Sequence, residues 1–68
     1  MQKWFLLYVT QNLPEASIIK GMLEENSVPV MIVNKQDSSY LNFGDMEIYV
    51  ANTFKNIARQ LVNKALMN

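Results

Sequence analysis

Residues 46–50 read MEIYV, and this stretch decides how the rest of the chain is interpreted. Apolar Ile48 and Val50 alternate with Glu47 and Tyr49. Successive side chains of a strand point to opposite faces, so the pattern predicts a β-strand with one buried face. The neighbouring segments must therefore supply further strands and a layer that covers Ile48 and Val50.

Two other segments have the composition of strands. Residues 3–10 (KWFLLYVT) are rich in aromatic and branched side chains and are too short for a convincing helix. Residues 28–33 (VPVMIV) form a second such run, and Pro29 near its start favours an edge strand because proline cannot donate a ladder hydrogen bond.

Residues 11–26 (QNLPEASIIKGMLEEN) carry the signals of a first helix. We expect Asn12 to cap it, with Pro14 in the first turn and Glu15 placed as in a capping box. Asn26, which tolerates the left-handed conformation, is the expected stop, and Gly21 is interpreted as a close approach of the helix to the sheet. The predicted apolar face has Ile18 at its edge and consists of Ala16, Ile19, Met22 and Leu23.

A second helix is expected after residue 51, capped by Asn52 or Thr53. Apolar residues recur along it at helical spacing and form a broad stripe. The stripe contains Phe54, Ile57, Ala58, Leu61, Val62, Ala65 and Leu66.

The element order is thus β-α-β-β-α in a single domain over residues 1–68. A right-handed crossover makes the first two strands parallel, and the third fits antiparallel between them. The expected fold is α+β, a ferredoxin-like two-layer sandwich that lacks the final strand and carries both helices on one face of a three-stranded sheet.

This arrangement leaves the other sheet face without cover from the helices. If Phe5, Leu7 and Val9 point at the helices, the residues pointing away are Trp4, Leu6, Tyr8 and Tyr49. The second strand adds either Val30 and Ile32 or Met31 and Val33. Because monomers rarely expose so large an apolar patch, we expect a homo-oligomer, formed by face-to-face packing or by pairing of first-strand edges. Another protein or an apolar ligand is the alternative cover.

The segment NKQDSSYLNFGD, residues 34–45, is long for a hairpin connection. It offers hydroxyl, amide and charged groups for a ligand or partner, and the candidate residues are Asn34, Lys35, Asp37, Ser38, Ser39, Tyr40, Phe43 and Asp45. The same residues also fit a purely structural turn. In that interpretation Asp37 caps one helical turn, Gly44 takes a positive φ, and Tyr40 or Phe43 closes the core.

Composition excludes several functions. Six basic and six acidic side chains cancel, and Glu47 lies beside Tyr49 on the outward face, so we expect no nucleic-acid binding. Without histidine or cysteine, the most common general base and zinc ligands of the Cys/His type are missing, and the remaining catalytic candidates are Asp37, Ser38, Ser39, Tyr40 and Asp45. We expect neither an enzyme nor a bound metal or cofactor. No segment has the length of a membrane span or the character of a signal peptide, which favours a cytoplasmic protein without membrane contact.

Several short motifs resemble the family of small bacterial proteins catalogued as putative prokaryotic signal-transducing proteins. They are Trp4 in the first strand, the N-x-x-E-A helix start (Asn12, Glu15, Ala16), I-x-x-G-x-L-E (Ile18, Gly21, Leu23, Glu24), Asn34, and Ile48 with Val50. The resemblance implies a GlnB-like domain related to nitrogen-regulatory P-II proteins. In those proteins the loop between the second and third strands binds effectors and targets, and residues 35–45 occupy that place. Their basic phosphate-binding residues have no counterpart here, so ATP binding is not implied.

Together these observations predict a non-catalytic regulatory or signal-transducing module. It would contact a small-molecule effector or a protein through the loop at 35–45 and the uncovered sheet face. The alternative is a structural interaction domain whose loop only closes the core.

Overall fold

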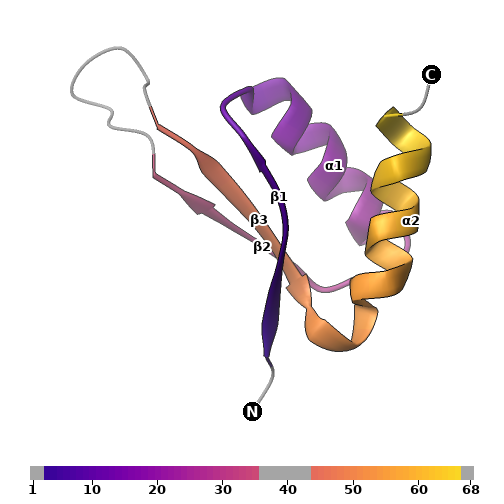
Figure 1. The fold of residues 1–68 in the computed structure, drawn as a ribbon. Coiled ribbons are helices and arrows are strands. Elements are labelled where there is room, and N and C mark those ends of the chain that lie inside the picture. The colour runs from indigo at the N-terminus through magenta and orange to yellow at the C-terminus, as the bar shows by residue number, and fades with distance from the viewer. Residues whose placement is uncertain (1–2, 36–43, 67–68) are drawn as a thin grey trace.

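The computed structural model describes residues 3–35 and 44–66. Within them the chain forms three strands, two α-helices and one 3-10 turn (Figure 1). In chain order these are β1 (Trp4–Thr10), α1 (Leu13–Glu25), β2 (Val30–Asn34), β3 (Met46–Ala51), the turn η1 (Asn52–Phe54) and α2 (Lys55–Leu66).

The sheet has the strand order β1-β3-β2, and β3 pairs antiparallel with both neighbours. Both helices pack on the same side of the sheet, as Figure 1 shows. The predicted α+β fold is therefore confirmed. The second strand is an edge strand, as Pro29 predicted.

The core lies between β3 and the two helices. Ile48 and Val50 of β3 are fully buried, whereas Glu47 and Tyr49, which alternate with them, are only partly covered. This confirms the alternation that predicted the strand. The helices contribute most of the remaining core residues, namely Ala16, Ile19 and Leu23 from α1 and Ala58 and Val62 from α2.

A β-bulge in β1 overturns one prediction. Leu6 pairs with Tyr49, but the next paired residue is Tyr8, opposite Ile48, so Leu7 is an extra residue. Tyr8 consequently lies on the helix side with Ile48 and packs against the core. The expectation that Tyr8 belongs to the outward face is wrong, and Val9, opposite Glu47, takes its place there.

The start of α1 is fixed by a chain of three hydrogen bonds. The Asn12 side chain accepts the Glu15 N–H at 2.9 Å, as predicted for the cap. In a capping box the Glu15 carboxylate would accept the Asn12 N–H. Here the Thr10 hydroxyl stands between them: it accepts the Asn12 N–H at 3.0 Å and donates to Glu15 Oε1 at 2.6 Å.

The end of α1 is a Schellman motif built without glycine. The Ser27 N–H donates to the Glu24 carbonyl at 3.0 Å, and the Val28 N–H donates to the Leu23 carbonyl at 2.9 Å. Asn26 does stop the helix, but its φ is −96°. The left-handed residue is Ser27, with φ 60°.

We expect Ser27→Gly to stabilise the domain by about 1 kcal/mol, because a left-handed conformation strains a residue that carries a Cβ and does not strain glycine. For a domain of this size the thermal midpoint should rise by about 4–8 °C, measured by circular dichroism at fixed protein concentration. Ser27→Ala keeps the strain and serves as the control. An equal gain in both variants would show that the backbone at Ser27 is not the cause.

Two smaller expectations about the helices are also corrected. A Cβ built on Gly21 meets no atom within 4 Å, so this glycine does not mark a close approach to the sheet. Asn52 and Thr53 lie inside η1, which follows Ala51 and begins without a side-chain cap. The chain thus enters α2 through the 3-10 turn η1.

Candidate functional site

The face of the sheet opposite the helices is the candidate site, and we call it the open face. No helix of the described residues lies on this side (Figure 1). The registers settle which part of β2 it includes: Met31 lies opposite Tyr49 and Val33 opposite Glu47. The open face therefore consists of Trp4, Leu6 and Val9 of β1, Met31 and Val33 of β2, and Glu47 and Tyr49 of β3.

Most of the open face is apolar and accessible. Exposed fractions are 40% for Trp4, 43% for Leu6, 43% for Val9 and 37% for Met31. Trp4, Leu6 and Tyr49 are thus placed as predicted. Sequence reasoning missed Val9, because the bulge at Leu7 moves the alternation of β1 by one residue.

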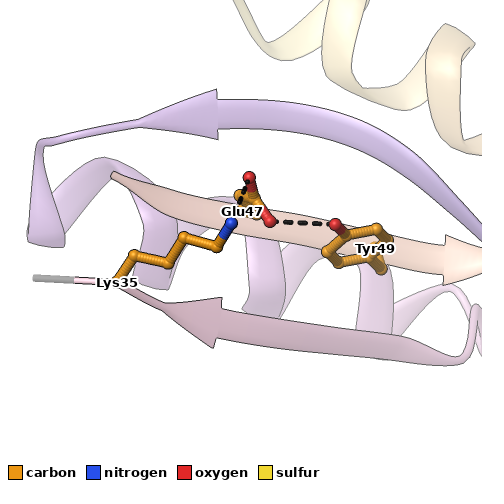
Figure 2. A network of polar contacts seen from close by, with 3 residues as sticks. All are labelled: Lys35, Glu47 and Tyr49. Carbon is orange, nitrogen blue, oxygen red and sulfur yellow. Dashed lines mark hydrogen bonds and ion pairs between the residues drawn. The ribbon is translucent and has the colours of Figure 1, made fainter. Parts of the chain in front are cut away.

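A polar network stands among these apolar side chains (Figure 2). Glu47 accepts a hydrogen bond from the Tyr49 hydroxyl at 2.8 Å and forms an ion pair with Lys35 Nζ at 3.4 Å. The Glu47 side chain is only 18% exposed, whereas that of Lys35 is 58% exposed. Glu47 is therefore held between two donors on a largely apolar surface.

The network changes how Tyr49 titrates. Its hydrogen bond to Glu47 raises the pKa of Tyr49 above the ordinary value, desolvation and the Glu47 charge add to the shift, and the Lys35 charge opposes it. The pKa of Tyr8 is also raised, mainly by burial and further by the charge and hydrogen bonding of Glu15. Folding therefore favours the protonated form of both phenols.

Alkaline pH should consequently destabilise the domain. Above the unfolded tyrosine pKa of about 10 the folded chain retains protons that the unfolded chain has released, so the free energy of unfolding falls as pH rises through the raised values. Urea unfolding of the wild type and Tyr49→Phe at successive pH values measures this. We expect a smaller alkaline loss in Tyr49→Phe, and an identical loss would contradict the assignment to Tyr49.

The two ends of the predicted loop lie beside this network. The Lys35 N–H donates to the Asp45 carbonyl at 2.8 Å, and Asp45 Oδ1 accepts a bond from Gln11 Nε2 at 3.2 Å. Gly44 has φ 118°, which confirms its predicted positive φ. Asn34 ends β2 on the core side, opposite Met46. The other loop candidates, Asp37, Ser38, Ser39, Tyr40 and Phe43, lie outside the described residues.

A second feature lies on the helix side of the sheet. A cleft of about 350 Å³ opens between the start of α1 and the end of α2, and it is lined by Asn12, Pro14, Glu15, Ile18, Ile19, Ala65 and Leu66. The carboxylate of Glu15 already accepts a hydrogen bond from the Thr10 hydroxyl. The cleft therefore has largely apolar walls, and its two polar side chains, Asn12 and Glu15, both form hydrogen bonds at the start of α1.

Two further findings concern metal ions and membranes. Among residues 3–35 and 44–66, no three acidic side chains come close enough together to hold a metal ion. Neither described helix combines the length and apolar character needed to cross a membrane.

Comparison with known proteins gives a family and nothing finer. Neither the curated proteins nor the solved structures yielded a match. A family model described as "Putative prokaryotic signal transducing protein" matches residues 4–65, which include every described strand and nearly all of α2. The chain therefore belongs to the family of putative prokaryotic signal-transducing proteins.

Proposed function

We propose that this protein is a non-catalytic regulatory module that contacts an effector or a partner protein through the open face and the loop at 35–45. The observation that carries the proposal is the network of Lys35, Glu47 and Tyr49. It joins the first residue after β2, where the loop begins, to the centre of the open face.

The network gives a physical route from loop to face. A ligand that engages Lys35 would withdraw the cation from Glu47, which then keeps only the Tyr49 hydroxyl as a partner in the network. Because Lys35 is well exposed, the ion pair is worth about 0.2–1 kcal/mol, equivalent to a change of up to about fivefold in an equilibrium constant. That range suits modulation of a weak contact and would not support an all-or-none switch.

The chemistry of the open face supports a binding role. The ionisable side chains on the strands of this face are Glu47 and Tyr49, and they are hydrogen-bonded to each other. Histidine is the most common general base and cysteine the most readily activated nucleophile, and the sequence contains neither. Turnover of any substrate by the purified protein would overturn the non-catalytic assignment.

The test compares three immobilised forms of the protein in a lysate of the source cells. Met31→Lys places a charge on the open face, and Ile18→Lys makes the same change at a residue that is 68% exposed on α1. A partner identified by mass spectrometry should bind the wild type and Ile18→Lys and be lost from Met31→Lys.

A Lys35→Met variant tests the contribution of the loop. It removes the cation that pairs with Glu47 and leaves the apolar part of the open face unchanged. We expect partner affinity to change by no more than about fivefold. If all forms bind the same proteins equally, or if nothing binds in the lysate or in a thermal-shift screen of metabolites, the proposed function is wrong.

A further inference from the structure

We infer that the open face is covered by a second copy of this chain, packed face to face in a reversible dimer. The inference goes beyond the proposed function and names a second copy as the molecule that covers the same surface. Three observations support it: the apolar content of the face, its internally compensated charge, and the structure of both sheet edges.

The apolar content makes an uncovered face costly. Trp4, Leu6, Val9 and Met31 are each 37–43% exposed and belong to one side of a small sheet. Soluble monomers rarely display a contiguous apolar patch of more than a few hundred Å². Contact with another apolar surface removes these side chains from water.

The charge of the face selects the type of partner. Glu47 is its one formally charged strand residue, and Lys35 and the Tyr49 hydroxyl already compensate it within the same chain. A partner surface therefore needs no complementary charge, and a strongly acidic or basic partner gains nothing. A second copy presents the same neutral, apolar surface, which is the self-complementarity that a two-fold contact requires.

The edges of the sheet disfavour the other route to a dimer. β1 is interrupted by the bulge at Leu7, and bulges discourage edge-to-edge pairing. Two cations lie over its Phe5 ring, with Lys55 Nζ 5.8 Å and Arg59 Cζ 5.0 Å from the ring centroid. If the β1 strands of two copies paired along their edges, Lys55 and Arg59 of both copies would lie at the same interface.

The β2 edge is also poorly suited to pairing. It is five residues long and follows Pro29 directly. Short edge strands and proline are common means of preventing strand addition. Neither edge therefore competes with the open face as the contact between copies.

The small size of the face indicates a weak contact. Three strands spaced about 4.8 Å apart, the longest about 23 Å in length, cover about 300 Å² per copy. Stable complexes bury about 800 Å² per partner. We therefore expect a weak, reversible contact, so that the two copies exchange readily and another partner can compete for the face.

Sedimentation equilibrium of the purified protein, with concentrations spanning about 1–300 μM, tests the inference. The wild type should follow a monomer–dimer equilibrium. Met31→Lys and Leu6→Lys should each weaken it at least about tenfold, because a lysine would be buried without a partner. Ile18→Lys should dimerise like the wild type, and circular dichroism checks that every variant folds.

The possible results separate this inference from the proposed function. A wild type that is monomeric throughout, or a dimer unaffected by Met31→Lys and Leu6→Lys, overturns the face-to-face dimer. The proposed function would still stand if a lysate partner were lost from Met31→Lys. Conversely, a dimer broken by both face variants supports this inference even if the lysate and metabolite screens give no partner.

Discussion

Replacing Ile48 by alanine is expected to leave a large part of the protein unfolded at room temperature. Ile48 is fully buried on the central strand, where it lies opposite Tyr8 on one side and Ile32 on the other. Truncating a buried isoleucine to alanine costs about 2–5 kcal/mol, and the core of a domain this small supplies roughly 3–5 kcal/mol in total. The loss is therefore comparable to the whole stability.

Urea unfolding followed by circular dichroism measures this loss, at one fixed protein concentration because a dimer would make the midpoint depend on it. Ile18→Ala is the matched control. Ile18 is 68% exposed, so the same change should stay within about 0.5 kcal/mol. A cost below about 1 kcal/mol for Ile48→Ala would mean that β3 is not the centre of the core.

The second large effect is expected at Thr10, which is 9% exposed at the end of β1. Its hydroxyl both accepts the Asn12 N–H and donates to Glu15. Thr10→Val keeps the shape and removes both bonds, which should cost about 1–3 kcal/mol. The thermal midpoint would fall by about 4–8 °C for each kcal/mol.

Thr10→Ser is the control for this prediction, because it retains the hydroxyl and loses only a methyl group. It should recover most of the stability that Thr10→Val loses. If the serine variant is as unstable as the valine variant, packing of the methyl group and not the hydrogen-bond chain holds the start of α1.

The fold was predictable because its strongest signals are local. Alternation in residues 46–50 identified β3, and the Asn12 cap identified the start of α1. The bulge at Leu7 was not predictable, because residues 4–9 of β1 are apolar or aromatic on both faces, so neither register places a charged side chain in the core. Gly21 was wrongly interpreted as a close approach of α1 to the sheet, because the distance between the helix layer and the sheet cannot be read from local sequence.

The candidate site was only partly predictable. Alternation places Glu47 and Tyr49 on one face, and the hydrogen bond between them follows from that placement. The ion pair of Glu47 with Lys35 depends on the register of β2 against β3, which the apolar run at 28–33 does not specify. Met31 and Val33 could not be assigned to the open face for the same reason.

The place of Trp4 gives this protein an intrinsic optical reporter. It is the single tryptophan of the sequence, and it lies 40% exposed on the open face. Covering its indole with an apolar surface would move the emission maximum to shorter wavelength, whatever molecule does the covering. Events at this face can thus be followed in the unlabelled wild-type protein by fluorescence, at concentrations far below those that sedimentation requires.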